Sequence, residues 1–199
     1  MPADSAPINL THHFLIAMPG LQDESFSRSV VYLCEHSPNG ALGLIINKPS
    51  DINLKSLFEK VDLPLRRADL SDAVVFQGGP VQTERGFVLH EPLASAQDGS
   101  VEAPYASTMV IPGGLEMTTS KDVLEALSTG AGPRRVLVSL GYSAWGEGQL
   151  ESEIGENAWL TVAADPSLIF ETPVEQRYEK ALGLLGLQAW MLSPDVGHG

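Results

Sequence analysis

The chain of 199 residues has little positive charge. Twelve lysine and arginine residues stand against 25 aspartate and glutamate residues, which gives a formal net charge of −13. The densest basic groups are only the pairs Arg66-Arg67 and Arg134-Arg135. Because binding to a phosphate backbone needs a concentrated cationic surface, the composition argues against direct binding to nucleic acid.

Cysteine and long apolar runs are also scarce. A single cysteine cannot form an internal disulfide, so nothing here requires an oxidising compartment. No run approaches the roughly 20 apolar residues that a membrane-spanning helix needs. The first residues lack the cationic segment and apolar core of a signal peptide. We therefore expect a cytoplasmic protein that does not associate with a membrane.

Motifs that bind metals or cofactors are absent from the sequence. No His-Glu-x-x-His or Cys-x-x-Cys spacing occurs, and the neighbours His12 and His13 would point to opposite faces of a strand. Gly146-Glu-Gly148 begins like a dinucleotide fingerprint, but Glu151 stands where its third glycine would be. We predict neither a metal site nor a cofactor.

The composition that remains is typical of a globular protein. Hydrophobic residues make up 43% of the chain and charged residues 19%, and no repeat with a period of 20–50 residues is visible. A chain of this length can bury about 70% of its unfolded surface. We predict a single α+β domain over residues 13–192, with a flexible tail at 1–12 and a C-terminal tail at 193–199.

The stretch from Ser29 to Pro49 predicts a β-hairpin at the centre of the sheet. Residues 29–36 are rich in β-branched and aromatic side chains, and residues 42–46 in branched ones. Between them lies Ser37-Pro38-Asn39-Gly40, which has the composition of a tight turn. Few other segments are as apolar over such a length.

The order of the other elements favours a mixed, largely antiparallel sheet flanked by helices. Strands cluster in the first half of the chain and mix with helices in the second, which disfavours a regular βαβ array. Further strands are predicted at 14–18, 73–77, 86–91, 109–111, 115–118, 135–142 and 158–163. Helices are predicted at 53–60, 119–127, 147–157 and 173–185, a helical turn at 23–27, and a long surface loop at 92–105.

Cys34 and His36 form the one candidate pair for catalysis. Side chains two residues apart share a face of a strand, so the imidazole could lie near the thiol and lower its pKa. The charge of Glu35 would oppose thiolate formation. Free cysteines are among the most buried residues, so a packing role for Cys34 and a structural role for His36 are the alternatives.

The block from Gly141 to Glu151 is the best candidate for a surface site. A strand, a turn through Ser143 to Gly146 and an acidic helix would leave backbone N–H groups free beside the indole of Trp145. The turn is no nucleophile elbow, because Trp145 replaces its second glycine. The alternative is that Trp145 fills the core and that Glu147 interacts with the helix dipole.

Other polar and glycine positions complete the predicted binding residues. Glycine loops at Gly78-Gly79 and 146–148 would build the rim of a pocket, and His90 ends a strand as a further imidazole. The full set of candidate binding residues is Asn47, Lys48, Gly78, Gly79, His90, Trp145, Glu147 and Gln149.

Several sequence blocks together resemble the YqgE/AlgH family of bacterial proteins. They occur in order at residues 13–19, 34–36, 43–49, 78–80, 86–90, 118–124, 141–151 and 156–160, and include Gly43-Leu-Ile-Ile-Asn-Lys-Pro49. The resemblance implies a compact α+β domain with a twisted, partly barrel-like sheet surrounded by helices, in a mostly cytosolic protein. It carries no catalytic residues. One branch of that family has a transcriptional-regulator label through control of the exopolysaccharide alginate.

Two functional hypotheses follow. The first is a regulatory module that binds a protein or small-molecule partner, without direct contact to nucleic acid, as a monomer or weak homodimer. The second is a thiol-dependent enzyme or redox sensor that uses Cys34 with His36. Reactivity of the thiol separates the two, because a binding module does not need a cysteine of low pKa.

Overall fold

The computed structural model describes residues 9–20, 26–92, 105–130 and 132–192 of the chain. Its internal contacts divide the chain into two compact units. The first unit combines Met1–Asn47 with Ser143–Gly199, and the second unit is Lys48–Tyr142. That residues 13–192 behave as one domain stays a prediction.

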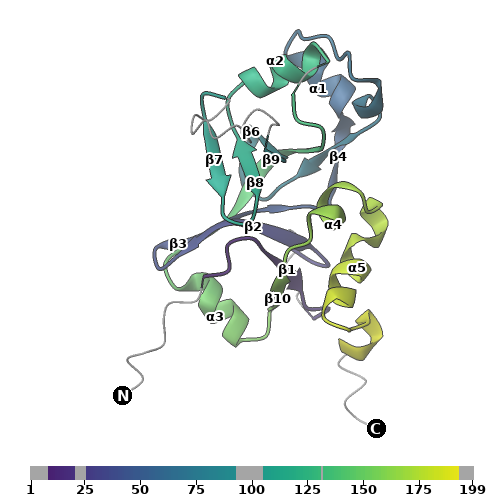
Figure 1. Ribbon diagram of the computed structural model, residues 1–199. Coiled ribbons are helices and arrows are strands. Elements are labelled where there is room, and N and C mark those ends of the chain that lie inside the picture. Colours follow the sequence, from purple (N-terminus) through teal and green to yellow (C-terminus); the bar gives the residue numbers. More distant parts are fainter. Residues whose placement is uncertain (1–8, 21–25, 93–104, 131, 193–199) are drawn as a thin grey trace. The chain divides into compact units, whose positions relative to one another are not determined.

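The strands of the first unit form an antiparallel arrangement around the predicted hairpin. Strand β2 (Val30–Ser37) pairs with β1 (His13–Ala17) on one side and with β3 (Gly40–Ile45) on the other. Beyond them, β10 (Trp159–Ala163) pairs with β1, and the last residues of β9 (Val136–Trp145) pair with β3. The hairpin and its central place among these strands are therefore confirmed (Figure 1).

A β-bulge interrupts the hairpin at Cys34. Leu33 pairs with Gly43, but Leu42 pairs with Glu35, so Cys34 is the extra residue. A bulge shifts the alternation of side chains along the strand that follows it. The simple rule that residues two apart share a face therefore does not apply between Cys34 and His36.

Helices of the first unit follow the strands late in the chain. They are α3 (Gln149–Gly155), α4 (Pro166–Phe170) and α5 (Arg177–Leu184), with 3-10 turns at Val174–Gln176 and Ala189–Leu192. Asp165 caps α4, and Pro166 is in its first turn, where a missing N–H costs nothing. The Tyr178 hydroxyl donates to the Ala17 carbonyl at 2.6 Å, which fastens α5 to β1.

The second unit contains β4 (Pro49–Asn53), α1 (Leu54–Lys60), β5 (Val74–Gln77), β6 (Val81–His90), β7 (Thr108–Ile111), β8 (Leu115–Thr118) and α2 (Asp122–Ser128), with a 3-10 turn at Ala68–Leu70. The residues of β9 up to Tyr142 lie between β5, in parallel, and β6, antiparallel. Strand β8 joins β6 to β7, and β4 pairs with β5. Apolar residues of α1 and α2 pack together on one face of these strands.

The predicted fold class is confirmed: an α+β protein with a mixed, largely antiparallel sheet flanked by helices. Several details differ from the sequence prediction. Strand β9 does not turn at Ser143 but runs on to Trp145, because residues 143–145 find partners on β3. Helix α3 begins at Gln149 rather than at 147, and β4 and α4 were not predicted. Residues 1–8 of the predicted tail at 1–12, most of the helical turn predicted at 23–27, residues 93–104 of the loop predicted at 92–105 and the predicted tail at 193–199 lie outside the described residues.

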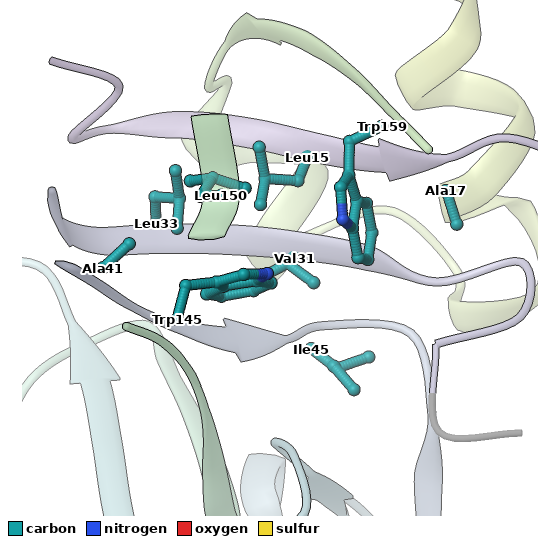
Figure 2. Packing of buried hydrophobic residues seen from close by; sticks show 9 residues of the cluster. All are labelled: Leu15, Ala17, Val31, Leu33, Ala41, Ile45, Trp145, Leu150 and Trp159. Atoms are coloured by element: carbon teal, nitrogen blue, oxygen red, sulfur yellow. The ribbon is translucent and has the colours of Figure 1, made fainter. Parts of the chain in front are cut away.

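Each unit has an apolar core of its own. In the first unit the core joins residues of β1, β2 and β3 to Leu150 of α3 and to two tryptophans, Trp145 and Trp159 (Figure 2). In the second unit Leu54 and Phe58 of α1 meet Val123 and Leu127 of α2 over the sheet. None of the helices in the described ranges has the length and apolar character needed to cross a bilayer.

Candidate functional site

Cys34 is a core residue. Its side chain is only 2% exposed, and burial raises the pKa of the thiol, with a further rise from the negative charge of Glu35. Because the thiolate is the nucleophilic form of cysteine, the thiol is protonated and shielded at neutral pH. This environment is typical of a cysteine that packs.

Both ring nitrogens of His36 are already engaged. The Nδ1 atom accepts the backbone N–H of Leu10 at 2.9 Å, and Nε2 lies 2.6 Å from Oε1 of Glu151. Since a backbone N–H can only donate, Nδ1 carries the lone pair and Nε2 carries the proton that Glu151 accepts. His36 therefore fastens β2 to α3 and to the segment before β1, and neither nitrogen is available to deprotonate Cys34.

Trp145 lies in the core of the first unit and is 4% exposed. Its ring contacts Trp159 at a centroid distance of 6.0 Å and Phe26 at 5.9 Å. Its Nε1–H donates to Oε1 of Glu153 at 3.2 Å. The indole is thus a packed residue with a satisfied N–H, and it does not offer an exposed aromatic face.

Two exposed polar residues, Glu147 and Gln149, lie close to Trp145 in the sequence, and Gln149 stabilises the turn. Glu147 is exposed in the turn before α3. Gln149 accepts the backbone N–H of Gly146 at 2.9 Å and donates to Glu153 at 3.0 Å. The predicted surface site therefore keeps no convergent set of free polar groups around the indole.

Asn47 has a local structural role. Its side-chain oxygen accepts the backbone N–H of Val30, and its amide donates to the carbonyl of Arg28, both at 2.9 Å. It thereby closes the turn before β2. Asn47 ends the first segment of the first unit and Lys48 begins the second unit, where the Lys48 carbonyl accepts the N–H of Gln77 at 2.8 Å.

Gly78 and Gly79 are buried and serve close packing. The N–H of Gly78 donates to the carbonyl of Leu140 at 2.9 Å. A side chain added at Gly141, where φ is +78°, would meet the carbonyl of Gly79 at 2.6 Å. Both the positive φ of Gly141 and the close approach of the Gly79 carbonyl require glycine at position 141. These glycines allow β9 to lie close to the segment between β5 and β6.

His90 is fully buried in a hydrogen-bonded chain of the second unit. Its Nδ1 lies 2.9 Å from the carbonyl of Glu91, so Nδ1 carries the proton. Its Nε2 then accepts the hydroxyl of Thr118 at 2.8 Å, and Thr118 accepts that of Thr108 at 2.9 Å. Burial lowers the pKa of His90, which keeps the ring neutral.

Glu116 has a buried side-chain oxygen without a hydrogen-bond partner in the described residues. It lies opposite His90 on β8 and is 6% exposed. Its Oε2 is the one buried side-chain nitrogen or oxygen without a hydrogen-bond partner among the described residues. Three or more metal-ligating side chains do not come together anywhere in the described part of the chain.

The second unit contains a cavity that sequence analysis missed. We call it the α1–α2 cavity; its volume is about 240 Å³. Its apolar lining comes from Leu57 and Val61 at the end of α1, Leu124 of α2, and Val88, Val138 and Leu140 of the sheet. Polar residues complete it, namely Glu84, Thr118, Thr119, Ser120 and Lys121.

Gly86 explains why this part of the sheet is open. Gly86 lies on β6, where it pairs with Leu140 of β9. It stands two residues before Val88 and so shares the face of Val88 that α1 and α2 cover. A Cβ added at Gly86 would meet no atom within 4 Å, and Gly86 lines the cavity. The local signal in the sequence was a single glycine between the polar first half and the apolar second half of β6.

The arrangement defines an α+β protein with a cavity of about 240 Å³ and without an assembled catalytic group among the described residues. A family model described as AlgH-like matches residues 14–190. The chain is similar to UPF0301 proteins of Variovorax paradoxus and a Polaromonas species, which are 76% and 79% identical over 198 residues, with complete coverage of both chains in each case. It therefore belongs to the AlgH-like family, as the sequence blocks predicted.

Two solved structures resemble the chain. The solution structure of the AlgH protein from Pseudomonas aeruginosa is 45% identical, with a TM-score of 0.74, and covers 98% of this chain and 99% of that one. A crystal structure of a protein from Corynebacterium diphtheriae has a TM-score of 0.69 over 91% and 90% of the two chains. Because its identity is 20%, this second likeness supports the fold alone.

Proposed function

We propose that the protein is a ligand-responsive regulatory module, in which a small molecule held in the α1–α2 cavity governs contact with a partner protein. The observation that carries the proposal is the cavity itself. Its lining combines apolar side chains with a few polar ones, as in most small-molecule sites, and its volume lies just below the roughly 300–1,000 Å³ of drug-sized pockets. A metabolite-sized ligand fits this description.

The module is proposed to act in the cytoplasm through protein contacts and not through DNA, as a monomer or weak homodimer. A net charge of −13 opposes approach to a phosphate backbone. Regulation would then pass through a partner whose affinity depends on the ligand. A gel shift with duplex DNA at submicromolar protein, weakening steeply as salt rises, would contradict this part of the proposal.

A thiol-dependent enzyme or redox sensor is the second hypothesis. The burial of Cys34 and the two engaged ring nitrogens of His36 argue against it. The binding module therefore has the stronger physical support.

Thermal-shift titration with four six-carbon probes tests the cavity as a ligand site. The probes are hexanoate, hexylamine, hexanol and L-leucine, which differ only modestly in size but carry different charges. Gly86→Leu should fill the cavity without contacting the backbone, and Gly183→Leu adds the same side chain at an exposed site on α5 where a Cβ also meets nothing. We expect at least one probe to raise the melting temperature of the wild type and of Gly183→Leu but not of Gly86→Leu. Absence of any such probe would overturn the proposal.

A further inference from the structure

The α1–α2 cavity carries two opposite charges above its apolar floor. Glu84 lies on β6 and Lys121 immediately before α2, and both line the cavity with exposed side chains. Within the described part of the chain, neither residue forms an ion pair. Two uncompensated charges of opposite sign thus face the same space of about 240 Å³.

Two other polar groups of the lining already form hydrogen bonds within the protein. The Ser120 hydroxyl accepts the N–H of Ser107 at 3.1 Å and donates to Asp122. The Thr118 hydroxyl belongs to the chain that ends on His90. The groups left to recognise a ligand by charge are therefore the carboxylate of Glu84 and the ammonium of Lys121.

A ligand with a single charge fits this pair poorly. An anion that approaches Lys121 also meets the negative charge of Glu84, and a cation that approaches Glu84 meets Lys121. A zwitterion satisfies both, because its carboxylate pairs with Lys121 while its ammonium pairs with Glu84. The apolar floor formed by Val88, Val138 and Leu140 then receives an alkyl group.

We infer that the α1–α2 cavity binds a zwitterionic α-amino acid with an apolar side chain of the size of leucine. The inference rests on the proposed function, for which it names the ligand class. The side chain occupies the space above Gly86, where a Cβ would meet no protein atom. The two charged groups select against molecules that lack either the amine or the carboxylate.

Isothermal titration with L-leucine and three analogues tests the inference. The analogues are 4-methylpentanoate, which lacks the amine, 3-methylbutylamine, which lacks the carboxylate, and glycine, which lacks the side chain. In the wild type we expect each analogue to bind at least tenfold more weakly than leucine. Binding of 4-methylpentanoate or 3-methylbutylamine as tightly as leucine would overturn the inference.

Charge variants assign the contacts. Glu84→Gln and Lys121→Gln should each lower the affinity for leucine at least tenfold. Glu84→Gln should not lower the affinity for 4-methylpentanoate, which has no amine to pair with Glu84. The matched controls are Glu179→Gln and Lys180→Gln on exposed positions of α5, which should leave leucine binding unchanged. Unchanged leucine binding in Glu84→Gln or Lys121→Gln would overturn the inference. The melting temperature of each variant confirms that it is folded.

The cavity-filling variant separates failure of the inference from failure of the proposed function. If a non-zwitterionic probe binds the wild type as tightly as leucine and is lost in Gly86→Leu, the ligand class is wrong but the cavity remains a ligand site. If Gly86→Leu binds leucine as the wild type does, the ligand lies elsewhere and the inference fails. If Gly86→Leu weakens the binding of none of the probes, both the inference and the proposed function fail.

Discussion

Trp145 and Trp159 donate their indole N–H groups to the same atom, Oε1 of Glu153, at 3.2 and 2.9 Å. Their rings meet edge to face with centroids 6.0 Å apart (Figure 2). The two tryptophans therefore share both a packing contact and a hydrogen-bond acceptor. One carboxylate thereby satisfies the two indole donors of this core. The relationship links the end of β9, helix α3 and β10 within the first unit.

Removing one of these rings should be costly. Trp145→Ala is expected to lower the free energy of unfolding by about 3–5 kcal/mol, because a buried aromatic ring leaves a cavity. Trp145→Phe keeps most of the packing but loses the N–H donor, so its loss should be nearer 1 kcal/mol. Urea denaturation measures both, with Leu184→Ala at a half-exposed position as the control. A loss below about 1 kcal/mol for Trp145→Ala would show that the ring is not part of the core.

The thiol should be inert in the folded protein. Because Cys34 is buried and burial raises its pKa, iodoacetamide at neutral pH should alkylate the native protein far more slowly than free cysteine. In urea above the unfolding transition the rate should approach that of free cysteine. Mass spectrometry of quenched samples follows the reaction. Native labelling faster than that of free cysteine would revive the thiol hypothesis.

The sequence predicted the central hairpin because its signals are local. A β-branched and aromatic run, a Pro-Asn-Gly turn and a second branched run lie next to one another. The bulge at Cys34 has no such local signal, since it depends on which residue of β3 pairs with Glu35. The proximity proposed for Cys34 and His36 rested on an uninterrupted strand, and the bulge at Cys34 breaks that premise.

The α1–α2 cavity could not be predicted from the sequence, because it too depends on contacts between distant parts of the chain. The α1–α2 cavity takes its lining from α1, α2 and three strands, whose residues range from Leu57 to Leu140. The burial of Trp145 likewise depends on Trp159 and Phe26, which are distant in sequence. Composition and spacing located apolar elements, but they could not show which positions between those elements stay unfilled.

Glu116 should lower the free energy of unfolding. Its buried Oε2 has no partner in the described structure, and an unsatisfied buried acceptor costs roughly 1–3 kcal/mol. Glu116→Met removes this oxygen at similar side-chain length, so we expect the free energy of unfolding to rise by about 1 kcal/mol. Glu59→Met, at an exposed position on α1, should change it by less than about 0.5 kcal/mol. A loss of stability in Glu116→Met would show that the carboxylate has a compensating partner.

The buried imidazole of His90 should make stability depend on pH. Burial lowers the pKa of His90 below its ordinary value of 6.5, although the carbonyl of Glu91 and the charge of Glu116 oppose this shift. Well above pH 6.5 the ring is neutral in both the folded and the unfolded form, so His90 contributes no slope there. As the pH falls below 6.5, the unfolded chain binds a proton that the native ring resists, and stability declines by at most about 1.4 kcal/mol per pH unit for this one group.

A variant isolates this contribution from those of other groups. Urea unfolding at pH 8, 7, 6 and 5.5 gives the free energy of unfolding of the wild type and of His90→Gln. His12, whose pKa burial also lowers, remains in both proteins and cancels in their difference. We expect the gap between the two free energies to be constant from pH 8 to 7 and to change in favour of His90→Gln below 6.5. Parallel curves down to pH 5.5 would mean that His90 is not held neutral in the fold.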